Sequence, residues 1–531
     1  MDDHDQDYDG STEQTPLVTE SDRATHPRRP PYRSMLSVVS VASIASINVP
    51  KVHNGNTIVI LLCGILLVAA SASGFVNIPL TKLVENVVCH QYYDQAQSLD
   101  VPIEEKLCKV PAVQSKMAYI FATVDVCEAI AGLLAAFPWG IAADRIGRRP
   151  VFATALTGIA LSILWMMAVL WFDTVFPPSM IASACLWRFI GGGNAVVVGI
   201  LLSMVSDVIP EDKRFVPIVQ NPNLVSALVG GLVSPALSSA MMAATGPWPV
   251  MLVGIACLLV GAAAFMFVPE TLQRKQFDAT GDNNHPTGFK GHVHHTVDQL
   301  KDSISMLKSP SLILVLLTCL TTHPIAAGVT QFLVQFVSKR YEIPIQSTGY
   351  VQTAYGLAQI VQALLILPWL SRLLMQDSTP KLLRRPNEQE RDLSLAKWSF
   401  GLVSLGFFVL AMAPTLWMFV FGLVVLALGS AATSLVRSLM SLYVDPEHRS
   451  RLFSLVGMVE TVGNMYGPPM LAGLFSLGMK LGEPWIGLPY FGIMALSLTV
   501  LIMLLFVRVP KQAAEAPPPP PPYEEARVHQ D

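Results

Sequence analysis

The stretch Gly140-Ile-Ala-Ala-Asp144-Arg145-Ile-Gly147-Arg148-Arg149 lies between two long apolar runs. It places a glycine, an aspartate and three arginines within ten residues. Each flanking run is long enough to cross a bilayer, because a spanning helix needs about 20 mostly apolar residues. The stretch therefore predicts a short charged loop between two membrane helices.

The composition is typical of a membrane protein. Hydrophobic residues make up 52% of the 531 residues and charged residues only 14%, whereas soluble proteins carry about 25% charged residues. The mean hydropathy is +0.49. Because the backbone must satisfy its own hydrogen bonds inside hydrocarbon, such a chain crosses the bilayer as helices. We therefore expect an all-α membrane protein with many spans.

Twelve apolar runs are long enough to span, and a polar stretch separates the first six from the last six. They are expected at 57–80, 117–142, 151–172, 179–206, 217–243, 247–268, 310–338, 345–375, 395–414, 416–443, 451–476 and 486–508. The predicted organisation is a disordered N-tail (1–56), a six-helix bundle (57–268), a cytosolic linker (269–309), a second six-helix bundle (310–508) and a disordered Pro-rich C-tail (509–531). A repeat supports two pseudo-symmetric bundles, since Pro210-Glu211 and Pro446-Glu447 each follow a predicted helix and precede basic residues.

The distribution of basic residues predicts the orientation. With a cytosolic N-terminus, 26 of the 35 Lys and Arg residues fall in cytosolic segments and seven on the other side. Cytoplasmic loops carry the excess of Lys and Arg. We therefore expect both termini in the cytosol, in the plasma membrane or the vacuolar membrane.

The quoted stretch fits the G-x-x-x-D-R-x-G-R-R signature at every position, and the chain thereby resembles major facilitator superfamily transporters. It is most similar to fungal drug:proton antiporters, and more loosely to the proton-coupled folate transporter branch. The resemblance implies a secondary transporter that works by alternating access. It also implies a gate, in which helix 11 approaches Gly140 and Asp144 lies beside the positive end of that helix when the cytosolic side is shut. The gating motif is completed by Arg145, Gly147, Arg148 and Arg149, which can pair with acidic groups or lipid phosphate.

Two further signatures are present in weaker form. Arg188, with Gly192 four positions later, resembles the R-x-x-x-G signature of helix 4. An intramembrane arginine could bind an anionic substrate, tune a carboxylate or hold two helices together. Helix 5 resembles the G-x-x-x-G-P signature of proton-linked exporters, with serine in place of some glycines. The expected helix-packing residues are Gly230, Ser234 and Pro235, and in helix 11 Gly463, Gly467 and Pro468.

Energy coupling requires a group within the membrane that takes up and releases a proton. Asp125 and Glu128 lie three residues apart on one face of helix 2, and Glu460 lies in helix 11. With Arg188 they are the candidates for proton coupling, because an unpaired carboxylate in a low-dielectric site takes up a proton readily. Two alternatives stay open: Asp125 could face a wet outer vestibule, and Glu460 could pair structurally with Arg188 or Arg437.

Polar residues on helices 7 and 8 are the candidates for the substrate cavity. On helix 8, Gln352, Tyr355, Gln359 and Gln362 form one helical stripe, which should face protein or water rather than lipid. Hydrogen bonding between helices would explain the same pattern. The candidate cavity residues are His323, Gln331, Gln352, Tyr355 and Gln359. A broadly apolar cavity with aromatic groups would suit an amphipathic organic molecule.

Two of the seven cysteines fall in the loop expected between helices 1 and 2. Cys89 and Cys108 could form a disulfide in an oxidising compartment, although the sequence does not fix the geometry. Together with Tyr92 and Tyr93 they give the loose resemblance to the folate transporter branch, whose members take up substrate. The helix 5 motif and Pro269-Glu270-Thr271 favour export instead.

The C-tail contains Pro520-Pro521-Pro522-Tyr523, which fits the P-P-x-Y ligand of WW domains. We expect either a WW-domain ubiquitin ligase as partner or a plain solvated spacer. The other expected partners are the bilayer and a small-molecule substrate, with no nucleic acid and a monomeric state.

No catalytic cluster or metal-ligand spacing is found, so we expect no enzyme, no cofactor and no metal site, only a proton gradient. The linker histidines could bind metal adventitiously; they are His285, His292, His294 and His295. A non-transporting sensor on the same fold stays open as an alternative.

Overall fold

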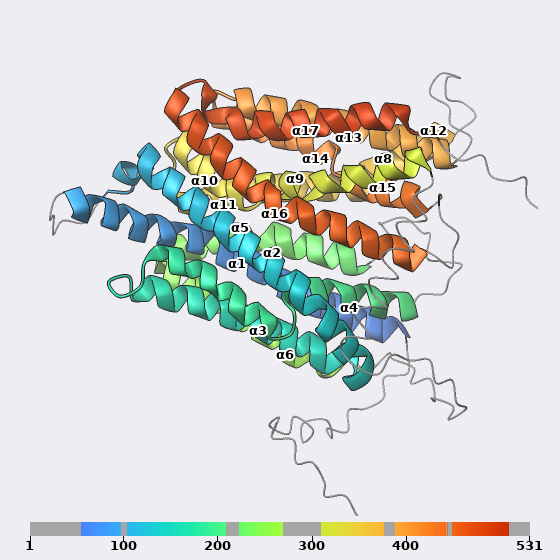
Figure 1. Ribbon diagram of the computed structural model, residues 1–531, viewed down its shortest axis with the longest axis horizontal. Coiled ribbons are helices and arrows are strands. Elements are labelled where there is room, and N and C mark those ends of the chain that lie inside the picture. Colours follow the sequence, from blue (N-terminus) through green and yellow to red (C-terminus); the bar gives the residue numbers. More distant parts are fainter. Residues whose placement is uncertain are drawn as a thin grey trace, which may run out of the picture. The chain divides into compact units, whose positions relative to one another are not determined.

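The computed structural model describes residues 55–96, 104–208, 222–268, 309–375, 388–441, 443 and 449–508. All regular elements in these ranges are helices (Figure 1), so the prediction of an all-helical protein is confirmed. Within them, nine helices are long and apolar enough to cross a membrane, or ten if one bent pair is counted as a single span. The predicted count of twelve is not confirmed. The Pro-Glu repeat, the linker histidines and the WW-ligand motif lie outside the described residues.

The first half of the described chain, residues 55–268, contains six long helical segments. They are α1 (Gly55–Ala96), α2 (Pro111–Ile146), α3 (Arg148–Trp171), η3 (Pro178–Phe189) with α4 (Gly193–Val208), α5 (Pro222–Thr245) and α6 (Pro247–Phe265). Prolines occupy the first turn of α2 and α6, where the missing N–H costs no helical hydrogen bond. The short 3-10 helix η2 (Glu105–Lys109) precedes α2.

The second half, residues 309–508, is more interrupted. Its elements are α8 (Pro310–Thr318), η6 (Cys319–Thr321), α9 (Thr322–Val329), α10 (Gln331–Arg340), η7 (Ile345–Ser347), α11 (Thr348–Val361), the π-helical turn η8 (Gln362–Ile366), α12 (Leu367–Met375), α13 (Glu388–Met412), α14 (Leu416–Leu428), α15 (Ala432–Ser441), α16 (Arg449–Leu481), η10 (Trp485–Gly487) and α17 (Leu488–Phe506).

Helix 1 was predicted too short. It was expected to end at residue 80, but α1 continues to Ala96. Beyond residue 80 the helix still buries one face, including Leu83, Val84 and Val88. A helix outside the membrane needs only such an apolar stripe and tolerates the polar residues between. Cys89 therefore lies on a helix, not in a loop.

Helices 4 and 7 were predicted as continuous and are broken. Between η3 and α4 the chain bends by 41°, and Gly191, Gly192 and Gly193 all have positive φ, which glycine adopts without steric cost. In the predicted helix 7, the break between α9 and α10 falls at Thr330, whose φ and ψ are −105° and −93°.

Each half has its own apolar core, and two further clusters cross between the halves. One cluster of buried side chains joins Ala118 and Ala122 of α2 to α9, α10 and α16. Another joins Phe75 and Ile78 of α1 to Val334 and Ile345. The main pairings between the halves are α2 with α16 and α5 with α11 (Figure 1). These four helices therefore make the largest part of the interface, and α1, α9 and α10 add to it.

Candidate transport and coupling site

A pocket lies at the interface between the halves. Its walls come from α2 on one side and from α9, α10 and α16 on the other; they are Ala118, Phe121, Ala122, Asp125, Ala327, Phe332, Gln335, Pro468, Leu471 and Ala472. Nearly all of this lining is apolar, with one carboxylate and one amide. Such a lining suits an organic molecule with few polar groups.

Asp125 is the charged residue of the pocket. Within the described part of the chain, no hydrogen bond or ion pair joins its carboxylate to another side chain, although Glu128 and Arg188 interact with it electrostatically. Keeping a partly buried carboxylate ionised without a direct partner is unfavourable. Asp125 is therefore suited to taking up a proton.

Glu128 has a different environment from Asp125. Arg188 Nη2 donates to Glu128 Oε1 at 2.7 Å, and Arg188 Nε lies 3.4 Å from Ser162 Oγ. The two charged side chains are 10% and 21% exposed. This ion pair agrees with two of the three roles expected for Arg188. The arginine links η3 to α2, and it lies close enough to tune a carboxylate.

A second ion pair lies in the other half. Arg437 of α15 and Glu460 of α16 are 2.5 Å apart, and 48% of the Arg437 side chain is exposed. Glu460 thus pairs with Arg437, which is one of the two arginines that the sequence offered as its structural partner. His323 is close enough to interact electrostatically with Glu460. Glu460 consequently has a direct cation partner that Asp125 lacks.

The glycines of the helix-packing motifs lie at close contacts. A Cβ built at Gly230 would lie 2.8 Å from the Leu67 carbonyl oxygen, and one built at Gly463 would lie 2.6 Å from that of Leu320. Thus α5 packs directly on α1, and α16 on the helix 7 segment, through corresponding residues 233 positions apart in the sequence. Ser234 likewise contacts Gly74, and Gly467 contacts Pro324. A side chain in place of these glycines would push the helices apart.

The stripe on helix 8 makes one hydrogen bond within its own helix and one to another segment. Tyr355 is buried and accepts a hydrogen bond from Gln359 Nε2 at 3.0 Å. Gln362 Oε1 accepts one from Ser430 Oγ at 3.0 Å. In contrast, Gln352 Oε1 is buried with no hydrogen-bond partner among the described residues. The side chain of Gln331 lies outside the described residues.

Gly140, the first residue of the gating motif, faces open space among the described residues. No atom of another described segment lies within 4 Å of a Cβ built at Gly140, and the same is true of Gly457 near the start of α16. Gly147 has a φ of 112° at the junction of α2 and α3. The side chains of Asp144 and Arg145 lie outside the described residues. Helix 11 is therefore not packed on Gly140 in this conformation.

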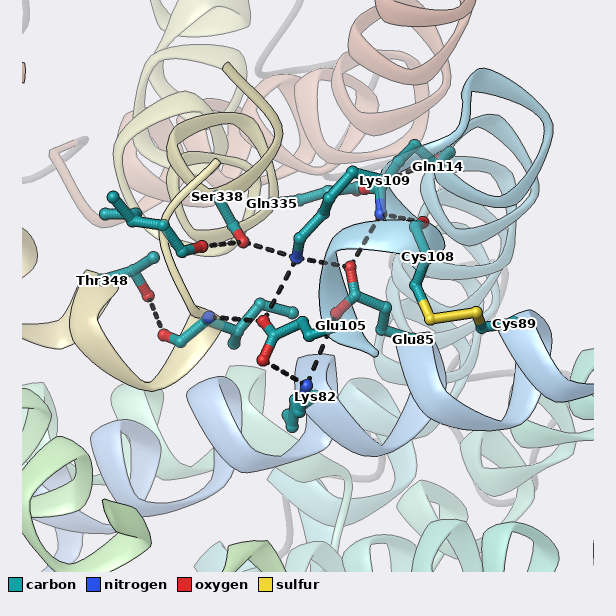
Figure 2. A network of polar contacts seen from close by, with 12 residues as sticks. Lys82, Glu85, Cys89, Glu105, Cys108, Lys109, Gln114, Gln335, Ser338 and Thr348 are labelled. Atoms are coloured by element: carbon teal, nitrogen blue, oxygen red, sulfur yellow. Dashed lines mark hydrogen bonds and ion pairs between the residues drawn. A yellow bond between two sulfur atoms is a disulfide. The ribbon is translucent and has the colours of Figure 1, made fainter. Parts of the chain in front are cut away.

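Two features of the interface were not anticipated. Phe332 lines the pocket and was not predicted, whereas Gln335, which also lines it, is one of the polar helix 7 residues expected to contact the substrate. A cluster of four charged residues lies at the interface end near η2: Lys82, Glu85, Glu105 and Lys109 (Figure 2). The i,i+3 and i,i+4 spacing of Lys82-Glu85 and Glu105-Lys109 was the available signal. Cys89 and Cys108 form a disulfide beside this cluster.

Comparison with known proteins agrees with this architecture. The family model of the Major Facilitator Superfamily matches residues 116–383 and 395–529. The MFS efflux pump atnC of Emericella nidulans is 29% identical over 462 residues, covering 84% of this chain and 88% of that protein. Efflux pump ustT of Aspergillus flavus is 26% identical, covering 78% and 81%.

Solved structures share the fold. The human organic anion transporter MFSD10 superposes with a TM-score of 0.55 at 17% identity, covering 85% of this chain and 99% of that one. The nucleoside transporter NupG gives a TM-score of 0.56 at 13% identity, covering 86% and 100%. With its apolar spans, its interface pocket and these matches, the chain belongs to the Major Facilitator Superfamily and is a multi-pass membrane transporter with fungal relatives.

Proposed function

We propose that this transporter exports a small organic molecule by alternating access and couples export to proton entry at Asp125. The observation that carries the coupling is the position of Asp125, in the interface pocket and without a direct partner among the described residues. A group in that position can exchange a proton with whichever side the pocket faces.

The neighbouring ion pair supports this role. Arg188 is bonded to Glu128 and also interacts electrostatically with Asp125. When Asp125 is ionised, Arg188 is shared between two carboxylates; when Asp125 is neutral, Glu128 has the arginine alone. Protonation therefore changes the charge balance between α2 and η3 at the interface. That change is the coupling step of the proposal.

The conformation supports alternating access. Direct contacts between the halves lie toward the N-terminal end of α2, where Ser115 Oγ and Ser476 Oγ are 3.1 Å apart. Farther along α2, a Cβ at Gly132 or Gly140 would meet nothing within 4 Å. With both termini in the cytosol, as proposed from the basic residues, this conformation is closed outside and open to the cytosol.

Export is favoured by the relatives. Proteins with 29% and 26% identity over most of this chain are named efflux pumps. The glycine contacts of α5 and α16 agree with the helix-packing motif of proton-linked exporters. The mostly apolar lining of the pocket supports an amphipathic organic substrate as the proposed cargo. The plasma membrane and the vacuolar membrane are the proposed locations.

The test is transport in proteoliposomes with an imposed pH gradient. Ethidium and a set of anionic and neutral amphipathic dyes serve as probes. We expect gradient-driven efflux that is lost in Asp125→Asn and retained in Asp173→Asn, a matched change in the connection after α3. Flux that ignores the gradient would remove the coupling role. Accumulation driven by an inward proton gradient would show uptake, and no flux of any probe would favour a sensor.

A further inference from the structure

The charge cluster at the end of the interface connects the two halves. Lys109 Nζ donates to Glu85 Oε1 at 2.7 Å, to Glu105 Oε1 at 3.3 Å and to Ser338 Oγ at 2.6 Å. An ammonium has three donors, so all of them are used. Ser338 belongs to α10 in the second half, whereas the two carboxylates belong to the first (Figure 2). Lys109 thus bonds across the interface.

Two further hydrogen bonds cross at the same place. Glu105 Oε1 accepts from the backbone N–H of Ile345 at 2.9 Å. Gln335 Nε2 donates to the carbonyl oxygen of Gln114 at 2.7 Å. Gln114 in turn donates to Glu85 Oε1 at 2.8 Å. Glu105 and Gln114 of the first half are therefore hydrogen-bonded directly to the second half, and Glu85 is connected to it through Gln114.

The cluster is buried and balanced in charge. Lys109 is 6% exposed and Glu85 is fully buried, while Lys82 Nζ lies 2.6 Å from Glu105 Oε2. Glu85 Oε2 has no hydrogen bond among the described residues; Lys82 is 3.8 Å from it and contributes only its charge. Two ammonium groups and two carboxylates cancel, which makes their burial tolerable. Separation of the halves would expose this group to water.

The disulfide fixes the position of Lys109. Cys108 immediately precedes Lys109, and Cys89 lies one turn after Glu85 on α1. Both cysteines are buried. The bridge therefore ties η2 to α1 at the point where Lys109 must reach Glu85 and Ser338 together (Figure 2). Without the bridge, η2 would have more freedom and Lys109 would be less well placed for both contacts.

We propose that Lys109, Glu85 and Glu105 form a latch with Ser338 and the Ile345 N–H that holds this end of the transporter shut, and that the Cys89–Cys108 disulfide keeps the latch in place. The latch rests on the proposed alternating access, because only halves that separate at this end need one. It is the counterpart of the gating motif at the opposite end of α2.

The reporter of closure is a cysteine pair at Ser115 and Ser476, whose hydroxyl oxygens are 3.1 Å apart. The remaining cysteines other than the bridged pair are replaced by serine; they are Cys63, Cys127, Cys185, Cys257 and Cys319. A protease site inserted between residues 269 and 309 separates the halves on a gel unless the pair is crosslinked. The rate of crosslinking by copper phenanthroline measures how much of the time this end is closed, with no need for substrate or gradient.

We expect Ser338→Ala to slow crosslinking about tenfold, the size of effect typical of a lost hydrogen bond to a charged group. This variant leaves every charge of the cluster in place, so misfolding is not expected. Lys109→Gln should slow it at least as much, and replacement of both bridged cysteines by serine should slow it about threefold. Ser404→Ala is the matched control: it removes a buried contact between hydroxyls, with Ser497, inside the second half, and should leave the rate within about twofold.

Equal rates in Ser338→Ala, Lys109→Gln and the parent would overturn the latch. A slower rate in Ser338→Ala but an unchanged rate without the disulfide would overturn the role of the bridge. Because crosslinking does not depend on flux, loss of the proposed coupling in the liposome assay would leave this result standing. Conversely, normal coupling with unchanged crosslinking would reject the latch alone.

Discussion

At the scale of single residues, two carboxylates three positions apart on α2 have different environments. Glu128 is held by Arg188 at 2.7 Å, whereas Asp125 faces the pocket without a direct partner among the described residues. The sequence placed both among the coupling candidates, because spacing alone cannot say which one the arginine reaches. The structure assigns Glu128 to the ion pair and leaves Asp125 facing the pocket, which is why we propose Asp125 as the residue that exchanges protons.

The two ion pairs should differ in their contribution to stability. Arg188→Gln leaves a mostly buried Glu128 without its cation, which should cost about 3 kcal/mol. Arg437→Gln should cost about 0–1 kcal/mol, because nearly half of the Arg437 side chain is exposed. Thermal unfolding of the purified variants measures both. The double change Arg188→Gln with Glu128→Gln should recover part of the loss, and equal losses in the two arginine variants would contradict the difference in burial.

The lowered pKa of Glu105 predicts that the closed end loses stability at acidic pH. Burial by itself raises the pKa of this carboxyl, but Lys82, the Ile345 N–H and Lys109 outweigh it and lower the pKa below 4.5. Glu85 of α1 also faces this group through Lys82 and Lys109. Since the lowered pKa belongs to the folded, closed state, the stabilisation is complete above pH 4.5 and is lost as the pH falls through the lowered value.

The loss of stability at acidic pH can be measured by comparing the melting temperature of the parent with that of Glu105→Gln. The difference in melting temperature between the parent and the variant should stay constant from about pH 8 to pH 5 and shrink below about pH 4. Glu104→Gln, one position earlier and exposed, is the control and should show no such pattern. A difference that instead changes near neutral pH would rule out Glu105 as its source.

At the scale of elements, close helix contacts depend on glycines whose role the motif predicted. Gly463→Ala would place a methyl 2.6 Å from the Leu320 carbonyl oxygen, so α16 must move away from the helix 7 segment. We expect a loss of about 1–3 kcal/mol in unfolding free energy. Gly473→Ala, on the same helix with nothing within 4 Å, should change it by less than about 0.5 kcal/mol. Similar effects at both positions would show that helix propensity, not packing, is responsible.

Breaks inside helices were the least predictable elements. Hydropathy marked the apolar run through Arg188 correctly but could not show that three successive glycines turn the chain there. A run of glycines is compatible with a continuous helix and with a bend, and only the packing of α3 on residues 187–190 decides between them. The break in helix 7 falls at Thr330, which is neither proline nor glycine, so no helix-breaking residue marks its position.

At the scale of the whole molecule, the open space at Gly140 offers a test of alternation. A side chain there fits this conformation, since nothing lies within 4 Å, but would obstruct the approach of helix 11 in the opposite one. Gly140→Val should therefore leave the melting temperature unchanged, maintain or raise crosslinking at residues 115 and 476, and lower flux about tenfold. Gly401→Val, equally open but on α13, which packs on helices of its own half, is the control. Normal flux in Gly140→Val would remove the gating role of this glycine.

The sequence by itself determined the class of the protein: helical, membrane-spanning and related to major facilitator superfamily transporters. Hydropathy and the motif from Gly140 to Arg149 are local properties, so they can be read without knowing which helices meet. Only the tertiary structure decided that Glu128 takes Arg188, that Asp125 faces the pocket, and that Lys109 reaches Ser338, 229 residues away. Such pairs depend on how distant helices pack. A buried charged group needs a partner, and the packing of the helices decides which partner lies within reach.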